Sequence, residues 1–272
     1  MREFIDYILY NYSIYNFFNR LAIAVVVVYN LSMFREKKNL LSYPSRMIRE
    51  RVYPNSNKKW VQFCSKVELE VFFEIFIISM IQYLPGTFLN PWYGKLVGTG
   101  ANYFGFAFFA PIILVLFCIW MKIDPLKQLD LVTPAYPLAL VFVKIGCAFG
   151  DCCKGMKWED LLGREIDGNF PSPLLEAFLA LVIYFFLRKY KEKAATGTLY
   201  PIFLILYSGS RFFAEFFRIE PNVIGNLKIY HIQCIIGVIL GLFLLPIVGM
   251  IQEKMQYSVK QKKKKSKAQR KK

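Results

Sequence analysis

The stretch HIQCIIGVILGLFLLPIVGMIQ, residues 231–252, contains 22 residues and no lysine, arginine, aspartate or glutamate. A helix needs about 20 consecutive apolar residues to cross the hydrocarbon core of a bilayer. The stretch lacks the strict alternation of polar and apolar residues that a strand of a membrane barrel shows. It therefore predicts a membrane-spanning helix, and a fold built from such helices.

Further apolar runs of similar length extend this pattern over the chain, which is 56% hydrophobic with a mean hydropathy of +0.35. They are residues 13–34, 67–87, 101–121, 131–150, 172–187 and 198–219. We expect an all-α fold, a polytopic membrane bundle of about seven transmembrane helices. Residues 1–252 would form a single transmembrane domain, followed by a basic, disordered tail at 253–272.

The net charge of +16 could indicate a nucleic-acid partner, but the distribution of the charges favours a topological explanation. Of the 35 lysines and arginines, 25 fall in one set of alternate loops, 7 in the other set and 3 in the runs themselves. Loops on the cytoplasmic side carry the excess of positive charge. The sequence therefore predicts an N-terminus outside, a C-terminus in the cytoplasm and no nucleic-acid partner. The tail could also contact anionic membrane lipids.

The sixth run contains YSGSRFFAEFFR, residues 207–218, in which charged and aromatic residues alternate at helical spacing. Tyr207, Arg211, Glu215 and Arg218 fall within a wedge about 80° wide on a helix with 3.6 residues per turn. Charged groups inside a membrane are costly and usually face a cavity or a partner. This face is predicted to be functional, although Arg211 and Glu215 could also form a purely structural pair.

Two charged residues in other runs are expected at the same depth. With the predicted topology, Lys144 lies near the outer end of its run and Glu176 about one turn below the start of the next. Together with Arg211 and Glu215 they predict a polar cavity that opens toward the outside. Arginine and lysine side chains there could bind the phosphate of a phospholipid headgroup.

The segment KIGCAFGDCCKG, residues 144–155, brings three cysteines close together in sequence. The cysteines could be small fillers beside a glycine-rich turn, a thiol nucleophile or a disulfide. A tetrahedral metal site would need a fourth ligand such as Asp151 or the single histidine, His231. We expect small fillers, and no metal ion or cofactor.

Three motifs in this order resemble the bacterial prolipoprotein diacylglyceryl transferase family. PAYPLALVFVKIGCAFGDCCKG (134–155) is similar to its signature region, and FPSPLLEAF (170–178) to its Pro-x-Gln-Leu-Tyr-Glu segment, with Glu176 at the glutamate. GTLYPIFLILYSGSRFFAEFFR (197–218) resembles its Tyr-Gly-x-x-Arg-Phe-x-x-Glu-Phe-x-Arg helix. The resemblance covers about residues 130–250.

The resemblance implies a multi-pass enzyme of the bacterial cell membrane. Such an enzyme transfers the diacylglyceryl group of phosphatidylglycerol to the lipobox cysteine of a preprolipoprotein, which gives a thioether-linked lipid and glycerol phosphate. The residues carried over as catalytic are Arg211, Lys144, Glu176 and Tyr207. Those carried over as substrate-binding are Arg211, Lys144, Gly146, Cys147, Gly155, Glu215 and Arg218.

The chain also departs from the family pattern. The stretch GTGANYFGFAF (98–108) has no histidine where the family usually carries a His-Gly motif, and Lys144 replaces the usual arginine. A relative that binds phospholipid without transferring it is therefore the alternative. A small-molecule transporter is less favoured, because the charges lie in the outer half of the bundle.

Overall fold

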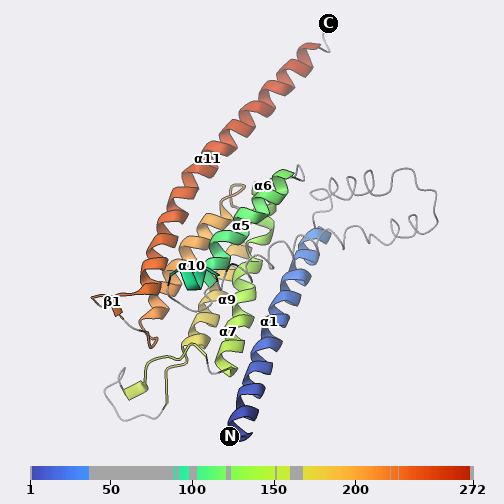
Figure 1. Cartoon of the computed structure of the whole chain (residues 1–272). Coiled ribbons are helices and arrows are strands. Elements are labelled where there is room, and N and C mark those ends of the chain that lie inside the picture. The colour runs from blue at the N-terminus through green and yellow to red at the C-terminus, as the bar shows by residue number, and fades with distance from the viewer. Residues whose placement is uncertain are drawn as a thin grey trace, which may run out of the picture.

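Long helices make up most of the structure, a computed structural model that describes residues 2–36, 89, 92–97, 103–120, 124–150, 152–159, 168–220, 222–225 and 227–269 (Figure 1). The helices are α1 (Arg2–Glu36), α5 (Tyr103–Trp120), α6 (Pro125–Val132), α7 (Ala135–Phe149), α9 (Ser172–Tyr190), α10 (Leu199–Glu215) and α11 (Ile229–Gln269). The strands described are β1 (Asn222–Ile224) and β2 (Leu227–Lys228), which form a short antiparallel hairpin between α10 and α11. The expected all-α class is confirmed.

Three described stretches are long and apolar enough to cross a membrane: Tyr103–Trp120, Pro125–Phe149 and Ile229–Lys254. A shorter apolar helical stretch, Ile14–Asn30, lies within α1. The remaining described helices, α9 and α10, coincide with the runs expected at 172–187 and 198–219. The run expected at 67–87 lies outside the described residues.

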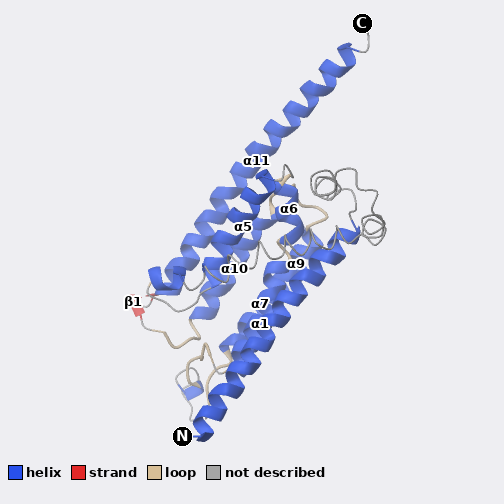
Figure 2. Ribbon diagram, turned by 45° about the vertical axis from the view of Figure 1, so that its right-hand side comes forward, coloured by secondary structure: helices blue, strands red, loops and turns tan. Residues whose placement is uncertain are grey.

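The long helices pack against one another in successive pairs. α7 packs between α1 and α9, while α10 packs against α9 on one side and α11 on the other. The start of α1 and the end of α11 lie at opposite ends of the bundle, and α11 extends well beyond the other helices (Figure 2). The hairpin lies beside the start of α11, and the segment after α7 lies at the end of the bundle where α1 begins (Figure 1).

Aromatic rings fill the centre of the bundle, where α5, α7 and α10 meet. Tyr136 and Phe203 are fully buried, and their ring centroids lie 5.8 Å apart. Phe203 stacks at 5.8 Å on Tyr207, one helical turn further along α10, and Phe104 of α5 contacts the same tyrosine at 5.3 Å. This packing holds Tyr207 in place from two sides.

A proline in α5 creates a polar contact inside this apolar core. Pro111 has no amide hydrogen, so the carbonyl of Ala107, four residues earlier, loses its helical partner. The hydroxyl of Tyr200 donates a hydrogen bond of 2.5 Å to that carbonyl. An unpaired backbone carbonyl in an apolar core would be costly, so this bond fixes α10 against α5.

Two glycines allow α11 to approach α10 closely. Gly237 and Gly241 are four residues apart and form a Gly-x-x-x-Gly pattern, which is typical of close helix contacts in membranes. A Cβ atom at Gly237 would lie 2.2 Å from Oγ of Ser208, and one at Gly241 would lie 2.9 Å from the carbonyl oxygen of Pro201. These distances leave no room for a side chain at either position.

The structure differs from the expected elements at two places. The helix expected at 131–150 begins earlier, at Pro125, and is interrupted between α6 and α7, because Pro134 has no amide hydrogen and the chain turns at Thr133 and Pro134. The basic segment expected to be a disordered tail continues α11 as a helix to Gln269. Lysine and glutamine have high helix propensity, and the preceding helix already provides the nucleus.

We predict that Gly241→Ala destabilises the protein by about 1–3 kcal/mol, because the added methyl group meets the backbone of α10. Gly249→Ala is the matched control in the same helix, since a Cβ atom there meets nothing within 4 Å. Thermal unfolding of the two purified variants in detergent measures the difference. Equal stability of both variants would contradict the close contact of α10 and α11.

Candidate functional site

A carboxylate in the first turns of α9 is the centre of a buried ion-pair network. Oε2 of Glu176 lies 2.7 Å from Nζ of Lys144 on α7. Oε1 of Glu176 forms an ion pair with Nη1 of Arg211 on α10 and lies 3.7 Å from Nη1 of Arg218. Charged residues from three segments therefore meet at one level of the bundle, as the sequence predicts.

A second carboxylate, Glu215, extends the network along α10. Oε2 of Glu215 lies 2.9 Å from Nη2 of Arg211 and 3.8 Å from Nη1 of Arg218. The guanidinium of Arg218 also donates a hydrogen bond of 3.3 Å to Glu220. Arg211 thus contacts two carboxylates and Arg218 contacts three, so both guanidinium groups are held in a fixed orientation.

Burial makes this network energetically critical. The side chains of Glu176, Arg211 and Glu215 are 4%, 5% and 0% exposed. Breaking a buried ion pair by removing one partner typically costs 3–5 kcal/mol, because the other charge stays buried without compensation. The network is therefore expected to be rigid, with its cations presented in a fixed geometry.

A small cavity adjoins the network. It has about 220 Å³ of empty space, counting its open side, and its polar lining comes from Glu176, Tyr207, Ser210 and Arg211. Leu140, Leu179 and Ala180 complete the wall with apolar surface. A cation thus lies next to apolar surface, as a ligand with an anionic headgroup and hydrocarbon chains would require.

The hairpin region supplies residues that the sequence did not single out. Nζ of Lys228 donates hydrogen bonds of 2.7 and 2.5 Å to the carbonyl oxygens of Glu215 and Arg218. The ring of Tyr230 lies under both guanidinium groups, 5.2 Å from Cζ of Arg211 and 5.5 Å from Cζ of Arg218. Lys228 thus donates hydrogen bonds to carbonyls that have no helical partner at the end of α10. Lys228 and Tyr230 together hold Arg211 and Arg218 in position.

The single histidine has a structural environment. Nδ1 of His231 accepts a hydrogen bond of 3.0 Å from the backbone amide of Lys228. Its ring packs between Phe212 and Phe216, with centroid distances of 4.7 and 4.6 Å. These contacts fix the start of α11 against α10, at the point where Lys228 reaches the site.

The chain after α7 is held against α10 by backbone contacts at a glycine. Gly155 forms an isolated bridge with Arg218, and the neighbouring amide of Met156 donates a hydrogen bond of 2.8 Å to the carbonyl of Phe217. A Cβ atom at Gly155 would lie 2.1 Å from the carbonyl oxygen of Phe170. Only glycine fits here, so this turn fixes the backbone around Arg218.

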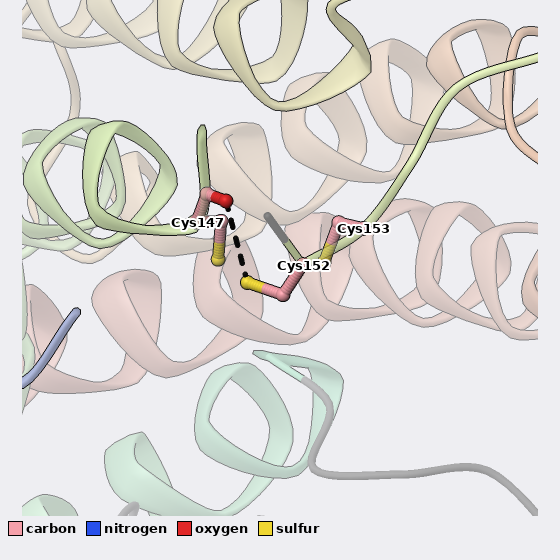
Figure 3. A group of neighbouring side chains, drawn as sticks. All are labelled: Cys147, Cys152 and Cys153. Carbon is pink, nitrogen blue, oxygen red and sulfur yellow. Dashed lines mark hydrogen bonds between the residues drawn. The ribbon is translucent and has the colours of Figure 1, made fainter. Parts of the chain in front are cut away.

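Three sulfur atoms lie together just beyond the network, at the end of α7. Cys147 lies in the last turn of α7, and Cys152 and Cys153 belong to the turn that follows the helix (Figure 3). Sγ of Cys152 donates a hydrogen bond of 3.5 Å to the carbonyl of Cys147. The cluster therefore borders the site through Lys144, one helical turn before Cys147.

The structure brings most of the predicted site residues together. Lys144, Glu176, Arg211, Glu215 and Arg218 form the network, Tyr207 lines the cavity, and Gly155 contacts Arg218. Gly146 faces α1 instead, since a Cβ atom there would lie 2.8 Å from Cβ of Phe18. The roles assigned to these residues by resemblance, including substrate binding by Gly146 and Cys147, stay predictions.

Comparison with known proteins gives a consistent result. A family model described as prolipoprotein diacylglyceryl transferase matches residues 70–247, which include the whole network. The phosphatidylglycerol–prolipoprotein diacylglyceryl transferase of Campylobacter hominis is 30% identical over 239 residues, which cover 82% of this chain and 80% of that protein.

Two further relatives carry the same name. The protein of Clostridium tetani is 29% identical over 57% of this chain, and that of Campylobacter lari is 34% identical over 59% of it. The chain spans 66% and 63% of the length of these two relatives, which is less than two thirds.

We predict that Glu176→Gln lowers the free energy of unfolding by about 3–5 kcal/mol, because Lys144, Arg211 and Arg218 lose a buried counter-charge. Glu192→Gln is the control, since Glu192 is exposed in the turn after α9. Thermal unfolding in detergent compares the two variants. A Glu176→Gln protein as stable as the control would show that the network does not stabilise the bundle.

Proposed function

This chain belongs to the prolipoprotein diacylglyceryl transferase family, and we propose that it transfers a diacylglyceryl group from phosphatidylglycerol to the lipobox cysteine of a preprolipoprotein. The observation that carries the proposal is the position of Arg211. Its guanidinium is fixed by Glu176 and Glu215 and lines the cavity together with apolar residues.

The proposed setting is the bacterial cell membrane, with seven spans, an outside N-terminus and a cytoplasmic C-terminus. The family is membrane-bound and polytopic, and several described helices are apolar enough to span a bilayer. The excess of lysine and arginine in alternate loops supports the orientation. An odd number of spans also agrees with helix ends at opposite sides of the bundle (Figure 1).

The proposed donor, phosphatidylglycerol, is supported by the charges and by the mixed polar and apolar lining of the site. A guanidinium has five N–H donors, and the ion pairs of Arg211 with the two glutamates engage only some of them. Nε of Arg218 is buried and has no hydrogen-bond acceptor among the described residues. A phosphate oxygen would satisfy such donors, while Leu140, Leu179 and Ala180 would contact the hydrocarbon part of the lipid.

The proposed reaction is one substitution at carbon. The thiolate sulfur of the lipobox cysteine attacks the glyceryl carbon that carries the phosphate, and a carbon–sulfur bond forms. The carbon–oxygen bond to phosphate breaks, and glycerol phosphate leaves with the electron pair. The thiol proton passes to a base, for which Glu176 and Glu215 are the carboxylates of the site.

The residues of the network would act mainly by stabilising charge. Negative charge develops on the phosphate oxygen as the carbon–oxygen bond breaks, and fixed cations near this oxygen lower the barrier. Arg211 is the proposed main contact, with Arg218 and Lys144 beside it. Tyr207, held by Phe104 and Phe203, would line the path of the headgroup.

A second candidate function is phospholipid binding without transfer. Lys144 offers a point charge where the family usually has the planar fork of arginine, and the stretch 98–108 has no histidine. The single histidine, His231, lies instead at the start of α11, where its Nδ1 accepts a hydrogen bond from the backbone amide of Lys228. An assay that measures lipid binding and transfer separately distinguishes the two functions.

We predict that Arg211→Ala reduces transfer at least about 100-fold, because the leaving phosphate loses a preorganised cation. The assay uses purified protein in liposomes with labelled phosphatidylglycerol and a lipobox peptide, and it measures lipid-modified peptide. Lys189→Gln, an exposed residue at the far end of α9, controls for insertion and should keep full activity. Full activity of Arg211→Ala would exclude the proposed role, and bound lipid with no transfer by the unaltered protein would favour the second function.

We further predict that Lys144→Arg retains transfer within about tenfold, while Lys144→Met loses it by about 100-fold or more. Arginine keeps the charge and adds a second donor to the phosphate, whereas methionine keeps only the volume. The same liposome assay compares both variants after their thermal stability has been measured. Equal activity of the arginine and methionine variants would show that the charge at position 144 has no role in transfer.

A further inference from the structure

The three cysteines at the end of α7 form a compact cluster of ligand atoms. The sulfurs of Cys147, Cys152 and Cys153 all lie within 4.8 Å of one another. Figure 3 shows the sulfurs of Cys147 and Cys152 directed toward each other, with Cys153 beside them. The sequence alone suggested small fillers, but fillers do not require three sulfurs to converge.

The backbone of the turn is shaped around this cluster. The amide of Cys152 donates a hydrogen bond of 3.1 Å to the carbonyl of Cys147, which closes the turn. Cys153 has a φ of 64°, the left-handed conformation, and is the one described residue other than glycine with a positive φ. This conformation is unfavourable for a residue with a Cβ atom, and its presence indicates that the surroundings impose it.

We propose that Cys147, Cys152 and Cys153 bind one thiophilic d¹⁰ cation, of the class of Zn²⁺ or Cu⁺. Thiolate ligands select such ions over hard cations. A metal–sulfur distance of about 2.3 Å places the sulfurs about 4 Å apart, so that modest side-chain rotation closes the cluster around an ion. Three protein ligands leave a further coordination position open for a solvent molecule.

Charge and access favour this site. Each thiol that binds releases a proton to solvent, and the three thiolates then exceed the charge of the ion. The ammonium of Lys144 acts electrostatically on all three thiols, and the guanidinium of Arg218 acts on Cys153. These cations offset the excess negative charge. Cys147 is buried, while Cys152 and Cys153 are half-buried, which leaves a path for the ion from the turn.

A bound ion would connect two parts of the candidate site. Cys147 is one helical turn from Lys144 on α7, and Cys153 is two residues before Gly155, which contacts Arg218. The ion would thus clamp the turn to α7 and stabilise the folded protein. A disulfide between two of the cysteines would leave the third thiol without a role, so the convergence of three favours the metal.

Titration of the reduced, full-length protein in detergent with Cd²⁺ as the probe tests the site. We expect one Cd²⁺ per chain, an ultraviolet sulfur-to-metal charge-transfer band and a rise in melting temperature on binding. Cys147→Ser, Cys152→Ser and Cys153→Ser should each weaken binding about tenfold or more. Cys118→Ser and Cys234→Ser are matched controls, because both cysteines are buried elsewhere in the bundle, and they should bind as the unaltered protein does.

Cys64 lies outside the described residues and would add a further thiol, so the reference protein and all variants carry Cys64→Ser. Melting temperatures without metal identify any variant that fails to fold. Binding that persists when Cys152 and Cys153 are replaced together in a folded protein would overturn the proposal. Mass spectrometry of the protein purified without reductant tests for a disulfide. A mass that is two hydrogens lower than that of the reduced protein, and that returns to the reduced value on treatment with reductant, would also overturn the proposal and assign a disulfide instead. The readout is metal binding, so the result is independent of the transferase assay.

Discussion

The carboxylate of Glu176 must be compensated inside an apolar bundle, and the arrangement of the surrounding helices follows from this constraint. A buried charge without a partner is costly in protein and in lipid. Lys144, Arg211 and Arg218 supply the compensation from α7, from α10 and from the turn that follows it. The network therefore fixes α7, α9 and α10 at one level, and the cavity lies beside it.

The same requirement to satisfy polar groups explains the supporting contacts. Tyr200 donates to the carbonyl that Pro111 leaves free, and Lys228 donates to the carbonyls at the end of α10. Asp130 accepts a hydrogen bond of 3.1 Å from the backbone amide of Leu199 and so stabilises the start of α10. α10 is thus anchored at its start by Asp130 and Tyr200 and at its end by Lys228, which gives Arg211 a fixed position.

Close backbone approach is the other means by which the site is built. Gly237 and Gly241 allow α11 to reach α10, which places Tyr230 beneath the two arginines. Gly155 allows the turn after α7 to reach Arg218. This turn also carries the cysteine cluster, so a metal ion there would act on the same backbone that supports the proposed phosphate site.

The sequence by itself determined the helical class, the approximate positions of α5, α7, α9 and α10 and the charged face of α10, because apolar length and helical period are local properties. It also indicated that Lys144 and Glu176 lie at the depth of Arg211. Only the tertiary structure decided that both arginines share Glu176 and Glu215, that Lys228 and Tyr230 support them, and that Gly146 faces α1. It also showed that three sulfurs converge. These features depend on the rotation and spacing of packed helices, which no local pattern encodes.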